Sequence, residues 1–149
     1  MQLARIVAAL ALVALAACSQ GLSKEEFIEQ ADVICREADE KTREIEPPRT
    51  AEALKGFVEE AQAITRDLLA DLRELEAPEG DADVIEDMTG RIENTMELLP
   101  EIQAAAEERN IADINRLATE LKDEAAEANR IAQDYGLEEC GRAEPAPVP

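Results

Sequence analysis

Residues 50–75 read TAEALKGFVEEAQAITRDLLADLREL, and their apolar side chains recur at intervals of three and four positions. This spacing places the apolar side chains on one face of an α-helix. Thr50 is a good N-cap for the helix, and the Ala-Pro-Glu-Gly turn at 77–80 ends it. The segment therefore predicts one long amphipathic helix. The side chains on its apolar face are Leu54, Phe57, Ala61, Ile64, Leu68, Leu72 and Leu75.

The segment before it has the same helical period. Ser23, followed three residues later by Glu26, forms a capping box, in which a hydroxyl and a carboxylate each satisfy a free backbone N–H. Pro47 and Pro48 end this helix, because proline disfavours the α conformation in the residue before it. The expected apolar stripe consists of Phe27, Ala31, Ile34, Ala38 and Ile45, with Ile28 and Cys35 at its edge.

A third helix follows the turn at 77–80. Asp81 is suited to cap its start. Pro100 lies inside the helical pattern, where proline removes a backbone hydrogen bond and clashes with the preceding turn. We therefore expect a kink or a break at this position. The apolar side of the helix is predicted to contain Ile85, Met88, Ile92, Met96, Leu99 and Ile102.

The boundary between the third and fourth helices carries no glycine or proline. Ile111 lies half a turn away from the preceding apolar stripe, so one straight helix cannot bury both sets. Asn110, with Asp113 three residues later, can restart the helix as a cap. Gly136 stands where a left-handed residue ends a helix. The fourth apolar stripe is predicted to contain Ile114, Leu117, Leu121, Ala125, Ala128, Ala132 and Tyr135.

Four amphipathic segments joined by short turns, without a strand-like alternating run, predict an all-α fold. The expected architecture is an antiparallel up-down four-helix bundle over residues 23–141. The alanine-rich positions of the first and last helices are expected to let these two helices approach closely. Residues 142–149 are rich in proline and are predicted to form a disordered tail.

The N-terminal residues 1–17 have the layout of a secretory signal peptide. Arg5 precedes an apolar run at 6–17, which is too short to span a membrane core that needs about 20 residues. The LAAC sequence at 15–18 resembles the lipobox of bacterial lipoproteins. This resemblance implies that Cys18 receives a diacylglyceryl group and becomes the N-terminus, with 18–22 as a lipidated spacer. The alternative is an ordinary cleaved signal, or an uncleaved anchor, in which the cysteine is incidental.

The same resemblance gives an expected location. A lipoprotein of this kind is exported and held on the extracytoplasmic side of a membrane by fatty acyl chains such as palmitate. Ser19, rather than aspartate, follows Cys18, which for bacterial lipoproteins implies sorting to the outer membrane if the cell has two membranes. The expected partner is therefore the membrane itself, reached through the N-terminal lipid.

Cys35 and Cys140 remain after Cys18, and an even pair in an exported chain should oxidise to a disulfide. Antiparallel topology brings the start of the first helix beside the end of the fourth, although Cys35 lies about 18 Å up its helix from Ser23. Either the segment 136–141 folds back along the first helix, or that helix overhangs the fourth. A redox-active pair is disfavoured, because there is no Cys-x-x-Cys motif and no histidine. The bundle is thus predicted to be closed by one disulfide.

Two short motifs surround these cysteines. ADVIC at 31–35 and YGLEECG at 135–141 resemble the paired signatures of a group of small bacterial lipoproteins and secreted proteins of unknown activity. The likeness spans residues 26–141. It supports the helical fold and the disulfide, and it implies no activity, cofactor or partner.

Composition argues against several classes of function. A formal net charge of -20 opposes binding to nucleic acid, which needs lysine and arginine against phosphates. Histidine is absent, and Phe27, Phe57 and Tyr135 are the three aromatic residues. The stretch from Asp81 begins like a calcium loop but has Glu86 where the loop needs glycine. We therefore expect no catalytic site, no cofactor and no specific metal site, and we expect that the protein is not an enzyme.

Two classes of function fit these observations. The first is a non-enzymatic, membrane-anchored envelope lipoprotein that presents an acidic surface to a protein partner. The alternative is a helical bundle that binds a small molecule or lipid, because alanine, Met88, Met96 and a kink at Pro100 can leave a cavity in the core. A weaker alternative is low-affinity binding of divalent cations by the acidic faces.

Overall fold

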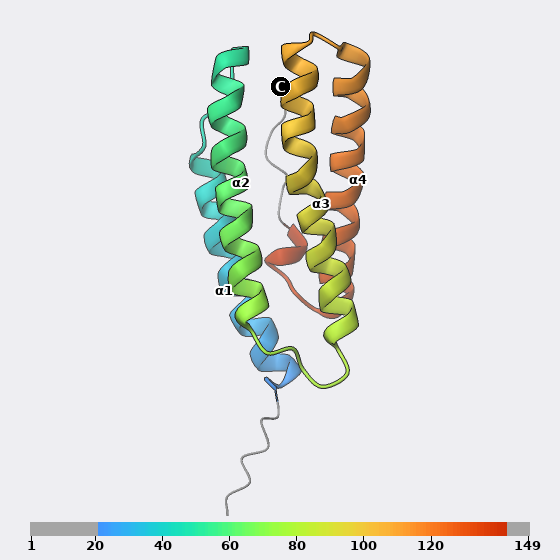
Figure 1. Ribbon diagram of the computed structural model, residues 1–149. Helices are drawn as coiled ribbons and strands as arrows, with labels where there is room; N and C mark the ends of the chain where they lie inside the picture. The colour runs from blue at the N-terminus through green and yellow to red at the C-terminus, as the bar shows by residue number, and fades with distance from the viewer. Residues whose placement is uncertain (1–20, 143–149) are drawn as a thin grey trace, which may run out of the picture.

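The computed structural model of the protein describes residues 21–142, apart from the side chains at positions 51 and 52. Four helices, α1 (Lys24–Glu44), α2 (Ala51–Glu74), α3 (Ala82–Glu107) and α4 (Ile111–Tyr135), precede a short 3₁₀ helix, η1 (Cys140–Arg142). The four long helices run alternately up and down, and residues 21–142 contain no strand (Figure 1). The predicted all-α, antiparallel four-helix bundle is confirmed. The predicted signal peptide, Cys18 and the tail beyond residue 142 lie outside the described residues.

Three predicted helix starts are confirmed by their hydrogen bonds. Ser23 Oγ accepts from the backbone N–H of Glu26 at 3.2 Å, and the Glu26 carboxylate accepts from the Ser23 N–H at 3.0 Å. Thr50 Oγ1 accepts from the N–H three residues later at 3.1 Å. Asn110 Oδ1 accepts from the N–H of Asp113 at 3.2 Å. Each contact satisfies a donor that the first turn of a helix leaves free.

Of the remaining helix ends, the start of α3 follows the prediction only in part. Asp81 occupies the N-cap position of α3, but its side chain makes no capping bond there. Its carboxylate instead accepts a hydrogen bond from the hydroxyl of Tyr135 at 2.7 Å. The break before α4 lies where it was predicted, although Ile111, whose position indicated it, is 64% exposed. Gly136 ends α4 with φ of 109°, a conformation that strains residues with a side chain.

Pro100 does not break α3, which continues to Glu107, so of the two expected outcomes, a kink or a break, the break is wrong. Proline has no N–H to donate to the carbonyl of Met96, four residues earlier. Gln62 of α2 supplies the missing donor, because its Nε2 lies 3.2 Å from that carbonyl oxygen. A side chain of the neighbouring helix therefore replaces the backbone bond that proline removes.

The substitution Gln62→Leu is expected to lower the free energy of unfolding by about 1–2 kcal/mol, because it leaves the partly buried Met96 carbonyl without a donor. In a Pro100→Ala background the new backbone N–H restores the helical bond, and the same substitution should cost close to nothing. Urea unfolding of the four proteins gives the coupling between the two positions. An equal loss in both backgrounds would contradict this account of the helix.

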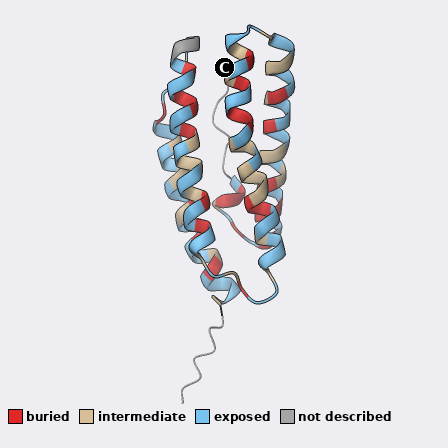
Figure 2. Ribbon diagram, in the orientation of Figure 1, coloured by how far each residue is buried: buried red, intermediate tan, exposed pale blue. Residues whose placement is uncertain are grey.

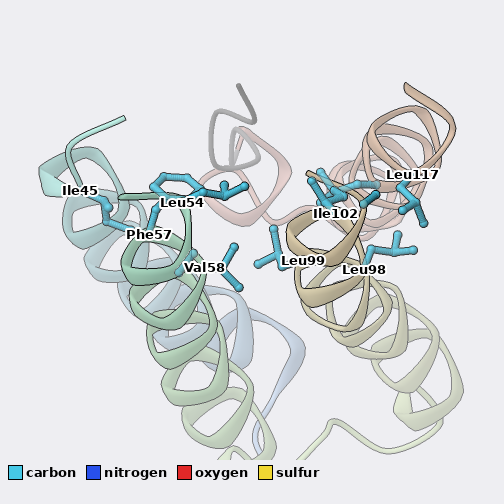
Figure 3. Close-up of a cluster of buried hydrophobic side chains, with 11 residues drawn as sticks. Ile45, Leu54, Phe57, Val58, Leu98, Leu99, Ile102 and Leu117 are labelled. Atoms are coloured by element: carbon cyan, nitrogen blue, oxygen red, sulfur yellow. The ribbon is translucent and has the colours of Figure 1, made fainter. Parts of the chain in front are cut away.

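The core is divided into two clusters of buried side chains (Figure 2). The distal cluster lies near the α1–α2 and α3–α4 turns, and Figure 3 shows its side chains between the facing helices. The proximal cluster lies near the start of α1 and the end of α4. The distal cluster contains Ile45, Leu54, Phe57, Val58, Ala61, Leu98, Leu99, Ile102, Ala105, Leu117 and Leu121. The proximal cluster contains Phe27, Ala31, Cys35, Leu72, Met88, Ile131, Ala132, Tyr135, Leu137 and Cys140.

Helices α1 and α4 do not approach each other as predicted. Within the described chain, no Cα atom of α1 lies within 8 Å of a Cα atom of α4. The segment 136–142 turns back from Gly136, and its η1 helix contacts both α1 and α4 (Figure 1). Gly141 allows this close packing, because a Cβ atom there would lie 2.5 Å from Cγ of Gln133. The C-terminal segment thus joins the two helices where their backbones stay apart.

Candidate functional site

A cleft lies between the two clusters, in the middle of the bundle, and is named here the central cleft. Its volume is about 130 Å³, and it is partly open to solvent. Side chains from all four long helices line it, and Cys35 and Cys140 form part of its proximal wall. Its distal wall includes Leu99 of α3 and Leu121 of α4. The bundle therefore encloses one apolar space with contributions from every helix.

Small side chains account for this space. Ala38 of α1, Ala61 of α2, and Ala125 and Ala128 of α4 all line the central cleft. Protein interiors are normally filled to the density of organic crystals by larger side chains such as those of the two clusters. At the level of the cleft, each alanine presents a single methyl group, which does not reach the opposite helix. The alanines that were predicted to bring α1 and α4 together instead leave the space between them.

Of the methionines and the proline that were expected to create a cavity, only one lines the central cleft. Met88 contributes to the lining of the central cleft. Met96 and Pro100 are not among the described residues that line it. The hypothesis of a cavity is thus supported, while its attribution to a kinked third helix is not.

The three threonine hydroxyls of the wall are already hydrogen-bonded within their own helices. Thr42 donates its hydroxyl to the carbonyl of Ala38 at 2.8 Å, and Thr65 donates to Ala61 at 2.9 Å. Thr95 donates to the carbonyl of Ile92 at 2.7 Å. Each hydroxyl proton is used within its own helix. Among the described residues, no buried side-chain nitrogen or oxygen lacks a hydrogen-bond partner.

One titratable side chain, Asp39 of α1, contributes to the lining of the cleft. Its side chain is 19% exposed and forms an ion pair with Arg43 at 2.6 Å. The Arg43 side chain is 70% exposed, so this ion pair lies where α1 meets solvent. The cleft therefore combines a mainly apolar interior with the side chains of Asp39 and Asn129.

The predicted disulfide is confirmed between Cys35 and Cys140, with their Cα atoms 5.1 Å apart. The sequence left two ways to reach this bond, and the structure shows the first of them. The segment 136–141 folds back along α1, so that α1 does not need to overhang α4. Leu137, with 1% of its surface exposed, anchors this segment in the proximal cluster.

Asp32 has a role that sequence reasoning missed. Its carboxylate accepts hydrogen bonds from the backbone N–H groups of Glu138 at 3.1 Å, Glu139 at 2.8 Å and Cys140 at 3.3 Å. These donors precede or begin η1, where a carboxylate satisfies N–H groups that have no partner within the helix. Two kinds of bond thus join the ADVIC motif at 31–35 to the YGLEECG motif at 135–141: the hydrogen bonds to Asp32 and the disulfide of Cys35. The presence of an acidic residue inside the first motif was the available signal.

Tyr135 fixes the proximal end of the bundle. Its ring packs edge-on against Phe27, with 6.0 Å between the ring centroids, and the ammonium of Lys24 lies 4.1 Å from its centroid. Its hydroxyl donates to Asp81 at the start of α3. Burial, and then the hydrogen bond to Asp81, raise the pKa of the Tyr135 phenol well above its ordinary value of about 10.

This shift predicts an alkaline loss of stability. A phenol whose pKa is higher in the folded state contributes fully below about pH 10, and its contribution falls as pH rises further. The unfolding free energy should therefore decline more steeply above pH 10 in the natural protein than in Tyr135→Phe. Tyr135 is the one tyrosine of the chain, so tyrosinate absorbance reports this group directly. The folded protein should titrate at higher pH than the urea-unfolded chain, and coincident titrations would contradict the prediction.

A second depression lies on the outer face between α2 and α3. Its residues include Leu75, Ile85 and Gly90, and it is more open than the central cleft. The ion pair between Arg73 and Glu93, at 2.8 Å, joins two of its lining residues across the two helices. Its walls come from α2, α3 and the segment that joins them, and its greater openness makes it the weaker candidate for a ligand.

The central cleft has a mainly apolar lining with few titratable groups. Asp39 is its one titratable lining group, because the two cysteines are joined as a disulfide. In the described residues, no group of three or more cysteine or carboxylate side chains is placed to hold a metal ion. No helix within residues 21–142 combines the length and the apolar character needed to cross a membrane. Comparison with protein-family models, with curated proteins and with solved structures gives no match.

Proposed function

We propose that the protein is a non-enzymatic, membrane-anchored envelope lipoprotein whose helical bundle binds a small apolar molecule in the central cleft. The observation that carries this proposal is the cleft itself, whose walls come from all four helices. Its volume of about 130 Å³ is close to that of an engineered apolar cavity of about 150 Å³ that binds benzene. A ligand with the bulk of a benzene ring or a short alkyl segment therefore fits inside.

The walls select for apolar ligands. The three threonine hydroxyl protons are already used by helix carbonyls, and most other lining side chains are apolar. A polar ligand would lose its hydration without gaining equivalent hydrogen bonds, which costs free energy. An apolar ligand gains about 25 cal/mol for each Å² that it removes from water.

The proposed lipid on Cys18 would bring the cleft near a source of such ligands. Apolar molecules partition into membranes, and the anchor would keep the bundle within reach of the bilayer. The bundle, with the chain's net charge of -20, is repelled by anionic lipid over about 8 Å, the Debye length in physiological salt. The body therefore stands off the surface and leaves the cleft accessible.

A second candidate is an interaction of the acidic surface with a basic protein. Acidic residues exceed basic ones by 20 along the chain, and most described ion pairs join residues three or four apart on one helix. A large excess of carboxylates therefore faces solvent and would attract a basic partner. Crosslinking in intact cells should recover a defined partner, and its consistent failure would count against this candidate.

The cleft can be tested by filling it. In a full chain carrying Cys18→Ser, which cannot be acylated at that position, benzene and 1-hexanol should raise the unfolding temperature and shift the methyl NMR signals of Leu99 and Leu121. Ala125→Leu should raise the stability by about 1 kcal/mol while weakening binding at least roughly tenfold. Ala126→Leu, an exposed position on the same helix, should leave binding unchanged.

The two variants separate the outcomes. If no probe binds the unmodified cleft, the proposed function is wrong. If Ala125→Leu binds as well as Ala126→Leu, the ligand lies elsewhere on the protein. Because the cleft-filling variant is expected to be more stable, its loss of binding cannot be ascribed to unfolding.

A further inference from the structure

The charge at the cleft bears on the kind of ligand head group that it accepts. Asp39 lines the cleft, whereas no lysine or arginine is among the described residues that line it. The Asp39 side chain is 19% exposed and therefore sits at the boundary between the cleft and solvent. A ligand whose apolar part fills the cleft has to leave its polar end at this boundary.

The carboxylate of Asp39 is available to such a head group. Its partner Arg43 lies one turn further along α1, and the Arg43 side chain is 70% exposed. An ion pair of this exposure contributes little stability, so a ligand cation can displace the arginine at small cost. A ligand anion, in contrast, meets Asp39 within a chain whose net charge is -20.

We infer that the central cleft takes single-chain amphiphiles with a cationic head group, such as alkylammonium ions, in preference to neutral ones, and disfavours fatty-acid anions. This inference rests on the proposed function, because it assumes that an apolar chain enters the cleft. It adds Asp39 as the residue that determines the head-group preference. The apolar walls bind the chain, and the carboxylate discriminates between the heads.

The test compares hexylammonium, 1-hexanol and hexanoate, which share one alkyl chain and differ in charge. Titration calorimetry of the full chain carrying Cys18→Ser at physiological salt should give affinities in that order. Hexylammonium should bind roughly tenfold more tightly than hexanoate, because the two charges differ in sign at one carboxylate. Asp39→Asn should abolish most of this difference between hexylammonium and hexanoate, and circular dichroism checks that the variant folds.

Two more variants serve as controls, one that should strengthen hexylammonium binding and one that should leave the preference unchanged. Arg43→Gln removes the competitor for Asp39 and should strengthen hexylammonium binding about twofold to threefold. Glu59→Gln removes a carboxylate of α2 that is not among the described cleft-lining residues, and it should keep the full preference. This variant matches the change in net charge caused by Asp39→Asn.

The results distinguish the head-group preference from the binding of an apolar ligand in the central cleft. Equal binding of the three probes, or tightest binding of hexanoate, overturns the inference and leaves the proposed function standing. A preference that persists in Asp39→Asn assigns the effect to overall charge and overturns the role of Asp39. If 1-hexanol and the other probes all fail to bind, the proposed function itself fails.

Discussion

Replacing both Cys35 and Cys140 by serine, in a chain that also carries Cys18→Ser, is expected to lower the free energy of unfolding by about 4–5 kcal/mol. The two cysteines are separated by 105 positions, so their bond closes a very long loop and lowers the conformational entropy of the unfolded chain. Small domains are commonly stable by about 5–15 kcal/mol, and this loss takes a large part of that range. Urea unfolding monitored by circular dichroism measures it.

The packing of α1 adds to this expectation. In the described chain α1 contacts α2 and η1, and it has no backbone contact with α4. The bond to Cys140 therefore closes a side of the bundle on which the backbones of α1 and α4 do not approach each other. Chemical reduction of the Cys18→Ser protein is the matched control and should give the same loss as the serine variant. A loss below about 1 kcal/mol in both would show that the disulfide is not needed for closure.

Asp32→Ala is expected to lower the free energy of unfolding by about 2–3 kcal/mol. Three backbone N–H groups at the start of η1 lose a charged acceptor, and charge-assisted hydrogen bonds are stronger than neutral ones. Asp32→Asn keeps one neutral acceptor oxygen and should lose about half as much. Asp71→Ala, at an exposed position of α2, is the control and should change stability by less than about 0.5 kcal/mol.

The same variant has a second measurable effect. Asp32 holds the backbone of Cys140 beside α1, and this places its sulfur next to that of Cys35. Without the carboxylate, the two thiols spend less time within bonding distance. Asp32→Ala should therefore be reduced at lower dithiothreitol concentration than the natural protein or Asp71→Ala. Unchanged stability and unchanged reduction together would contradict the role assigned to Asp32.

The helices and their ends could be predicted because local sequence determines them. The capping box at Ser23, the caps at Thr50 and Asn110 and the left-handed Gly136 depend on residues within one or two turns. The disulfide followed from the number of cysteines and the antiparallel topology. These features need no knowledge of how distant side chains meet.

The features that could not be predicted depend on contacts between distant segments. Gln62 pairs with the Met96 carbonyl across two helices, and Asp32 meets residues more than 100 positions away. No periodic pattern in the sequence indicates either contact. Asp81 was predicted as a helix cap, but the hydroxyl of Tyr135 competes successfully for its carboxylate.

Because of the central cleft, some apolar residues that were predicted to be buried are only partly buried in the structure. Ile64, Leu68 and Ile92 were predicted on buried stripes, but they line the cleft and are only partly buried. Leu69, directly after Leu68, is buried instead, and Val58 and Leu98 are buried beside the predicted Phe57 and Leu99. Periodicity identifies the inward face of a helix, and it does not show whether the opposite helix is close enough to cover that face.

The covalent bridge also determines how the chain would carry a mechanical load. A force applied between its two ends passes from Cys35 directly to Cys140, because the disulfide bypasses the 105 positions between them. Tension would unwind the first turns of α1, up to residue 35, and would then stop at the bridge. Helices α2, α3 and α4 lie within the bypassed loop and would bear none of the tension directly, whereas the unwinding of α1 would withdraw Phe27 and Ala31 from the proximal cluster.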